Sequence, residues 1–291
     1  MADVRRVGIL SPGDMGSAIG GVLHGHGMDV LTCLEGRSAL TRKRAEEAGF
    51  RDVPTIDDLV RECDIVLSVL VPSEAVPTGD AVAAAMRRTG ATPAFVECNA
   101  IAPQTVLNIE RAIRGAGASF IDAGIIGGPP RMDYSPNFEA SGPDTAPLET
   151  LRNYGINVKV VGPKIGQASG LKMMYAASTK GTTALWTEIM VAARALGLEE
   201  ALREEWGPNN GTAKSQMNGI PGMPHRVRRW VGEMEEIAAT FAAVGLTPKI
   251  LEGAADIYRF VASTPLADQT SREPNPTLDH LLDVLASQLR E

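Results

Sequence analysis

Residues 6–27 read RVGILSPGDMGSAIGGVLHGHG, and this segment is the most informative part of the sequence. The apolar run at 7–10 is typical of a buried central strand, and a glycine-bearing turn follows it. Small residues then open a helix that we expect to begin at Met15 or Gly16. Gly13 and Gly16 would let the backbone approach a pyrophosphate, although the first glycine of the G-x-G-x-x-G pattern is replaced by Ser11. The stretch therefore predicts a dinucleotide site, with an ordinary tight turn between strand and helix as the alternative.

The turn and the first helical residues are the expected contacts of the cofactor phosphates, because the unpaired N–H groups of a helix N-terminus attract anions. These residues are Ser11, Pro12, Gly13, Asp14, Met15 and Gly16.

The second expected strand, 29–34, is followed by basic residues where such folds recognise the ribose. Arg37, Ser38, Arg42 and Lys43 could surround a 2′-phosphate, which favours NADP over NAD. Glu35 could instead bond the ribose hydroxyl of NAD. A further alternative is that residues 42–44 form only a solvated helix face.

Strands and helices then continue to alternate. Strands are expected at 64–71, 94–98, 119–126, 138–141 and 157–161, with helices at 73–88 and 103–116. This pattern predicts a doubly wound, Rossmann-type α/β domain over residues 1–163, ending near Gly162 and Pro163. Helical spacing dominates afterwards and predicts an all-α domain over residues 164–291.

Ligands of such sheets lie beyond the carboxyl ends of the strands. The expected lining residues are therefore Val71 and Pro72, Asn99, and the glycines Gly127 and Gly128. Asn99 could bond the nicotinamide or its ribose, or it could cap the helix that starts near Pro103. The loop 125–136, with two glycines and three prolines, is expected to form a wall of the site.

Composition limits the function. The net charge of −7 over 291 residues comes with no long basic segment, so nucleic acid and anionic membranes are unexpected partners and a small molecule fits better. No run of about eighteen apolar residues occurs, and MADVRRVGIL lacks the apolar region of a signal peptide. We therefore expect a cytoplasmic protein. Cys33, Cys63 and Cys98 are isolated, which predicts reduced, buried thiols and no metal site.

A long helix is expected at 167–196, rich in alanine and methionine and therefore buried. One stripe of it is polar: Ser169, Lys172, Tyr175 or Ala176, Thr179 and Thr183 recur at helical spacing. Burial lowers the pKa of a lysine, so Lys172 is a candidate general acid or base. The alternatives are that the ammonium group reaches water, and that Tyr175, which could bond a substrate oxygen, only packs.

Three segments carry a family resemblance: SPGDMGSAIG, DAGIIGGPP and GQASGLKMMYAASTKG. Together they resemble the β-hydroxyacid dehydrogenase superfamily, which includes 3-hydroxyisobutyrate and 6-phosphogluconate dehydrogenases and the imine reductases. The resemblance implies hydride transfer between the nicotinamide and a small hydroxy acid or carbonyl compound. It also implies that Lys172 is the catalytic lysine, that Gly127 and Gly128 contact substrate, and that the helical domain forms a homodimer.

The sequence departs from the family pattern at Ser11, at Ile126, where a serine is usual, and at Ala176, where an asparagine is usual. The substrate is therefore open. Imine reductases usually lack the lysine, so its retention favours chemistry at a hydroxyl or carbonyl carbon. There are two alternative functions: an imine reductase with the same cofactor, and a dinucleotide sensor without turnover.

The segment HRVRRWVGEMEEIA resembles a subgroup of 6-phosphogluconate dehydrogenase-like proteins. Its basic residues, 225–229, could receive a carboxylate or a phosphate, or form a solvated helix face. Trp230 and the apolar residues that follow it at helical spacing predict a core or a subunit interface.

Overall fold

The computed structural model describes residues 4–131, 134–270 and 273–289. The chain divides into two compact units, residues 1–173 and 174–291. The sequence predicts a boundary after Pro163, where strands give way to helices. The division between the units lies further along, inside a helix, because the first turns of that helix pack against the sheet.

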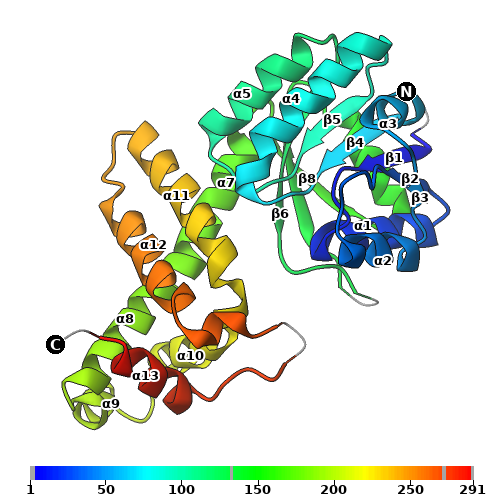
Figure 1. The fold of residues 1–291 in the computed structure, drawn as a ribbon. Coiled ribbons are helices and arrows are strands. Elements are labelled where there is room, and N and C mark those ends of the chain that lie inside the picture. Colours follow the sequence, from blue (N-terminus) through cyan, green and yellow to red (C-terminus); the bar gives the residue numbers. More distant parts are fainter. Residues whose placement is uncertain (1–3, 132–133, 271–272, 290–291) are drawn as a thin grey trace. The chain divides into compact units, whose positions relative to one another are not determined.

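The first unit is built on one sheet with the order β3-β2-β1-β4-β5-β6-β7-β8 (Figure 1). Neighbouring strands are parallel except for the antiparallel pair β6 and β7. The strands are β1 Arg6–Ile9, β2 Asp29–Thr32, β3 Arg51–Asp52, β4 Ile65–Ser68, β5 Ala94–Glu97, β6 Phe120–Ile126, β7 Asn137–Ser141 and β8 Asn157–Gly162. After β1 the chain adds β2 and β3 towards one edge of the sheet, and after β4 it adds the later strands towards the other edge. The topological switch point therefore lies between β1 and β4.

Helices cover both faces of the sheet. They are α1 Asp14–Gly25, α2 Ala39–Glu47, α3 Ile56–Glu62, α4 Pro72–Thr89, α5 Pro103–Arg114, α6 Ala146–Glu149 and α7 Gln167–Ala176. Ile19 of α1 and Leu148 of α6 belong to the core on one face. Leu59, Val82 and Ile109, from α3, α4 and α5, belong to the core on the other. The expected doubly wound fold is confirmed.

Three local expectations need correction. Helix α1 begins at Asp14, slightly earlier than expected. Strand β2 ends at Thr32 and β4 at Ser68, because the loops at the carboxyl edge leave the ladder early. Strand β3 was not expected, since its two exposed residues carry no apolar pattern.

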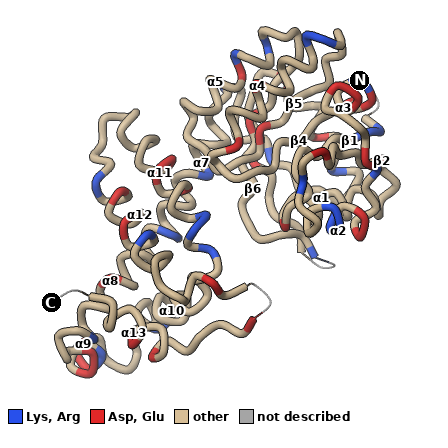
Figure 2. Tube along the Cα trace, in the orientation of Figure 1, with Lys and Arg blue, Asp and Glu red and all other residues tan. Residues whose placement is uncertain are grey.

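The second unit is helical, as expected. Its helices are α8 Thr182–Ala195, α9 Glu199–Trp206, α10 Gly211–Gly219, α11 Val227–Ala243, α12 Lys249–Ala262 and α13 Leu278–Ser287. Helices α11 and α12 pack together, and Trp230 meets Tyr258 edge to face with ring centroids 5.2 Å apart. Figure 2 shows acidic and basic residues interspersed along these two helices.

The expected long helix is a succession of α7, a π-helical segment at Ala177–Gly181, and α8. The expectation that it is buried is wrong for one face within this chain. Leu171, Met174, Tyr175 and Leu185 are 41 to 54% exposed. Ala168 and Met173 are buried, since the sheet or neighbouring helices cover only their side of the helix.

No helix in the described part of the chain is both long enough and apolar enough to cross a membrane. Cys33, Cys63 and Cys98 are buried free thiols, as expected.

Candidate functional site

The turn after β1 brings the start of α1 against the backbone of Ser11. A Cβ atom built on Gly16 would lie 2.2 Å from the carbonyl oxygen of Ser11, so only glycine fits there. Gly13 is the N-cap of α1 and supplies no side chain to cap it. A Cβ atom on Gly13 would have no neighbour within 4 Å. The turn therefore has the open space and the uncapped N–H groups that a phosphate needs.

The expected phosphate contacts differ in burial. Pro12 and Gly16 are buried, Ser11, Gly13 and Met15 are partly buried, and Asp14 is exposed. The carboxylate of Asp14 lies 3.8 Å from the guanidinium of Arg44. Ser11 stands where the family usually has glycine. Its carbonyl oxygen is the atom that Gly16 approaches closely. Its own φ is negative, so the backbone there does not require glycine.

Arg37 and Arg42 turn back towards the sheet. Nη2 of Arg37 donates to the carbonyl oxygen of Leu10, at the end of β1, over 3.1 Å. Nε of Arg42 donates to the carbonyl oxygen of Arg37 over 3.3 Å, and its Nη2 donates to that of Leu34. Lys43 and Arg42 are both exposed, as the alternative of a solvated helix face predicts, but Lys43 pairs with the exposed Glu47 while the Arg42 guanidinium bonds two backbone carbonyls.

Ser38 is the N-cap of α2, and its hydroxyl accepts the N–H of Thr41 at 3.2 Å. Val71 is the N-cap residue of α4 and its side chain is exposed, and Pro72 is the first residue of that helix. Both positions lie at the carboxyl edge of the sheet.

Asn99 does not cap α5, so that alternative is wrong. The N-cap is Ala102, and Asn99 is buried instead. Its Nδ2 donates to the Ser68 hydroxyl over 2.9 Å, and its Oδ1 accepts the N–H of Leu70. Asn99 thereby ties the carboxyl end of β5 to that of β4, two strands of the expected cofactor edge.

The glycine loop after β6 is shaped by a tyrosine that sequence reasoning missed. Gly127 has φ +134°, and a Cβ atom there would lie 2.0 Å from Oη of Tyr134. The N–H of Gly128 donates to the same oxygen over 3.2 Å. Gly127 and Gly128 are exposed. Residues 132 and 133 of the expected wall lie outside the described residues.

Lys172 lies at the carboxyl end of β5. Its Nζ donates to the carbonyl oxygen of Cys98 over 3.2 Å, and the residue is partly buried. Helix α7 comes this close because β6 carries Gly124 below it. A Cβ atom on Gly124 would lie 3.0 Å from both the Ala168 carbonyl oxygen and the Lys172 Cβ.

A buried carboxylate anchors the start of α7 to the sheet. Asp122 of β6 accepts the hydroxyl of Ser141 at 2.9 Å, the N–H of Gly166 at 2.8 Å and the N–H of Ser169 at 3.1 Å. It also accepts the Ser169 hydroxyl. Burial raises the pKa of Asp122, while these four donors act in the opposite direction. The signal available in the sequence was a single acid inside the apolar run SFIDAGII.

Asp122 belongs to a row of polar residues that crosses neighbouring strands. Ser68 of β4 pairs with Glu97 of β5, Glu97 pairs with Asp122, and Asp122 pairs with Ser141 of β7. All four residues are fully buried. Paired residues of adjacent strands project to the same face of a sheet, so these polar side chains form one line beneath α7.

Further along the helix, the polar stripe does not form a cluster with Lys172. The hydroxyls of Thr179 and Thr183 each donate to the carbonyl four residues earlier, over 3.1 Å. Tyr175 belongs to the second unit and is about half exposed, so it does not pack into a core.

The basic segment 225–229 also lies in the second unit. Arg228 pairs with Asp268 at 2.6 Å, and Arg229 pairs with Glu233 at 3.2 Å. Glu233 also pairs with Lys180, whose ammonium lies 5.6 Å from the centre of the Trp230 ring. Acidic neighbours thus already compensate part of this segment's charge.

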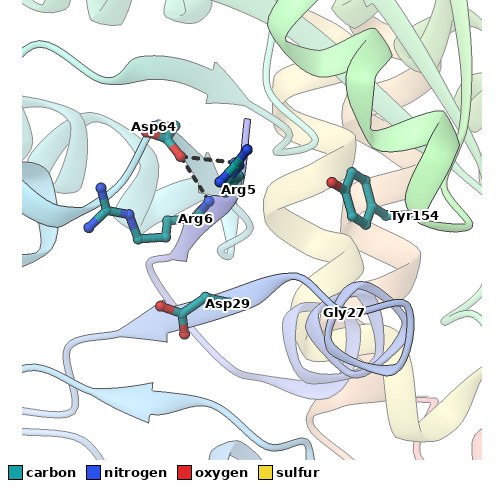
Figure 3. Close-up of a pocket in the computed structure, with 6 residues that line it drawn as sticks. All are labelled: Arg5, Arg6, Gly27, Asp29, Asp64 and Tyr154. Carbon is teal, nitrogen blue, oxygen red and sulfur yellow. Dashed lines mark hydrogen bonds between the residues drawn. The ribbon is translucent and has the colours of Figure 1, made fainter. Parts of the chain in front are cut away.

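Figure 3 shows a hollow lined by Arg5, Arg6, Gly27, Asp29, Asp64 and Tyr154. One Asp64 oxygen accepts the N–H groups of Arg5 and Arg6, both at 2.9 Å. Arg6 and Asp29 begin β1 and β2, so this hollow lies at the amino edge of the sheet. It is therefore separate from the carboxyl edge that carries the glycine turn and Lys172.

The strand order, the glycine turn and the uncapped α1 define a dinucleotide-binding protein of the Rossmann class. Residues 6–154 match the family model of the NAD binding domain of 6-phosphogluconate dehydrogenase, which spans more than half of the chain. The chain belongs to this family of nicotinamide-dependent oxidoreductases. Residues 193–261 match a second model, a domain of unknown function called DUF1932.

Two further proteins are similar to this chain at about 30% identity. An uncharacterised 28.5 kDa protein of Methanothermus fervidus is 30% identical over 199 residues, which cover 68% of this chain and 75% of that protein. A solved conserved protein, described as structurally similar to 3-hydroxyacid dehydrogenases, is 31% identical with a TM-score of 0.67, covering 88% of this chain and 96% of its own.

The fold is also that of a Mycobacterium tuberculosis 3-hydroxyisobutyrate dehydrogenase solved with L-serine. That enzyme has a TM-score of 0.70 at 20% identity, over 97% of this chain and 99% of its own. Imine reductases share the fold as well. The family model thus indicates a pyridine nucleotide-dependent oxidoreductase, and these structures show its fold.

Proposed function

We propose that this protein is a cytoplasmic, NADP-dependent oxidoreductase that acts on a small hydroxy acid or carbonyl compound, with Lys172 as general acid and base. The turn at 11–16 and the start of α1 would hold the pyrophosphate. Arg37 and Arg42 would face the 2′-phosphate, and the carboxyl ends of β4 and β5 would border the nicotinamide.

When bound, the nicotinamide supplies or accepts the hydride. The side chain of Lys172 would transfer the proton. In oxidation, the neutral amine of Lys172 would accept the proton of the substrate hydroxyl. In reduction, its ammonium would donate a proton to the developing alkoxide. The substrate loop at Gly127 and Gly128 would orient the rest of the molecule.

One observation carries this proposal: the contact of Lys172 Nζ with the Cys98 carbonyl at 3.2 Å. It holds a titratable nitrogen at the carboxyl edge of the sheet, where dinucleotide folds bind their ligands. Gly124 supports this placement, since it lets α7 approach β6 closely.

The test compares Lys172→Ala with the wild type on a panel of small hydroxy acids, aldehydes, ketones and cyclic imines with NADPH. We expect the mutation to reduce kcat about 10² to 10⁴-fold on the carbonyl substrate, which is the usual contribution of a general acid. Lys159→Ala is the matched control because Lys159 is exposed on β8. It should leave kcat unchanged.

Two results would overturn the proposal. If Lys172→Ala retains most of the rate on an imine, the protein is an imine reductase, since an iminium substrate arrives already protonated. If NADPH binds tightly but no substrate of the panel is turned over, the protein acts as a dinucleotide sensor.

A further inference from the structure

Two acidic side chains lie next to each other inside the polar row. Glu97 and Asp122 are paired in the register of β5 and β6, and both are fully buried. Two neighbouring carboxylates in a buried site repel each other, so their ionisation is coupled and the proton prefers one of them.

The surroundings decide which carboxyl keeps the proton. Asp122 accepts four hydrogen bonds from Ser141, Gly166 and Ser169, which favour its ionised form. Glu97 Oε1 accepts the N–H of Asn99 at 2.9 Å, and the Ser68 hydroxyl is a further donor. Its other oxygen, Oε2, has no hydrogen-bond partner among the described residues. The poorer solvation assigns the proton to Glu97.

Glu97 is also connected to Lys172 through the backbone at the carboxyl end of β5. It directly precedes Cys98, whose carbonyl oxygen accepts a hydrogen bond from the Lys172 ammonium. The Oε1 atom of Glu97 accepts the N–H of Asn99, the residue that follows Cys98. The charged groups that act on Glu97 are Lys172, which favours its ionised form, and Asp122, which disfavours it. Cys98 lies beside it as a buried neutral thiol, because burial raises the pKa of that thiol well above its usual value.

We propose that Glu97 acts on the reaction through Lys172, as a buried carboxyl whose charge changes with that of the lysine and sets the pH range of proton transfer. This inference rests on the role proposed above for Lys172. Glu97 touches neither substrate nor cofactor in this scheme, so it is a positioning and tuning residue.

The direction of the effect follows from the charges. Burial raises the pKa of Glu97 to about 8, so the carboxyl ionises at slightly alkaline pH. Its negative charge then stabilises the ammonium form of Lys172, which is the proton donor in reduction. Without this charge the lysine loses its proton at a lower pH.

The experiment measures kcat for reduction against pH, at saturating NADPH, for the wild type and Glu97→Gln. Glutamine has the shape of the neutral carboxyl and cannot ionise. We expect the alkaline limb of the profile to move to lower pH by about one unit, the size of an effect from one nearby charge. Glu97→Asp, which restores an ionisable group, should move the limb back towards the wild type. Glu110→Gln, a change on α5 outside the row, should leave it in place.

Thermal unfolding of the same variants gives a readout that does not depend on activity. The folded-state pKa of Glu97 lies above its usual value of 4.5, so the folded wild type holds a proton that the unfolded chain releases. The contribution of the protonated Glu97 to stability is therefore fully present below pH 4.5 and is lost as the pH rises towards 8. The difference in Tm, Glu97→Gln minus wild type, should grow across this window.

An unchanged alkaline limb in Glu97→Gln, or a Tm difference that is constant with pH, would overturn the inference. The two proposals fail separately. If Lys172→Ala remains fully active, the role of Lys172 fails. If Lys172→Ala is inactive while Glu97→Gln keeps the wild-type profile, only the role of Glu97 fails.

Discussion

At the scale of single residues, the arginines after β2 each have a contact in the backbone of the fold. Arg37 donates to the last residue before the glycine turn, and Arg42 donates to the loop that carries Arg37. A guanidinium group has five donors in a fixed plane, so an arginine can hold a carbonyl and still bind a phosphate. These contacts place positive charge beside the turn.

The residue-scale prediction concerns the 2′-phosphate. Arg37→Ala should weaken NADPH binding more than NADH binding, by roughly 1 to 3 kcal/mol, the range for a hydrogen bond to a charged group. Loss of the bond to the Leu10 carbonyl affects both cofactors, so only the difference reports on the phosphate. Fluorescence titration with both nucleotides measures it.

Lys43→Ala is the matched control, since Lys43 pairs with Glu47 on the exposed side of α2. This variant should weaken the binding of NADPH and of NADH only slightly and to the same extent. Equal weakening of NADPH and NADH by Arg37→Ala would show that Arg37 does not recognise the phosphate.

At the scale of elements, the position of α7 depends on a glycine in the strand beneath it, which has no side chain to hold the helix away. Gly124 lets the helix approach β6, and Asp122 on the same strand binds the N–H groups of its first turn. Asp122 anchors the helix, and Gly124 permits the short distance between helix and strand at which Lys172 reaches the Cys98 carbonyl. The position of the lysine is therefore a property of the contact between strand and helix.

We predict that Gly124→Ala lowers kcat with little effect on NADPH binding. The added methyl group would press on the Ala168 carbonyl and the Lys172 stem at 3.0 Å, so α7 must shift. A misplacement of about 1 Å can reduce the rate about 10²-fold, so we expect a smaller loss of kcat from a shift of a few tenths of an ångström. Steady-state kinetics and a cofactor titration on the same sample separate the two effects.

Gly21→Ala serves as the control, because a Cβ atom there meets Ala48 at an ordinary 3.7 Å. Full activity of Gly124→Ala would mean that Lys172 need not sit at this distance from the sheet.

At the scale of the whole molecule, apolar side chains remain uncovered in the helical unit. Met174 and Leu185, on the succession of α7 and α8, are 43% and 54% exposed. Exposed apolar surface on a helix of this kind is typical of a subunit interface. We propose that the protein is a homodimer formed through this unit.

The corresponding prediction is that Leu185→Glu converts the dimer to a monomer, because a carboxylate would be buried without a partner in the interface. Light scattering after size-exclusion chromatography measures the mass directly. Leu40→Glu is the control: Leu40 is 50% exposed on α2 of the first unit, so this variant should remain dimeric. A monomeric wild-type protein at micromolar concentration would exclude the dimer.

The sequence predicted the local elements well. An apolar run, a turn with Gly13 and Gly16, and a helix of small residues already specify β1 and α1, because each signal spans only a few neighbouring residues. The same reasoning placed Lys172 on a helix. It missed β3, whose Arg51 and Asp52 have no apolar pattern, and it assigned Asn99 a possible capping role that belongs to the position of Ala102.

The sequence alone thus predicted the alternation of strands and helices apart from β3 and its neighbourhood, the glycine turn and the candidate lysine, since hydrophobic period and turn chemistry act locally along the chain. That Ser68, Glu97, Asp122 and Ser141 form one buried row, and that Gly124 lies under Lys172, could be seen only in the folded structure. Those neighbours come from strands far apart in sequence. Their meeting depends on the strand order and register of the sheet, which are properties of the packed sheet as a whole.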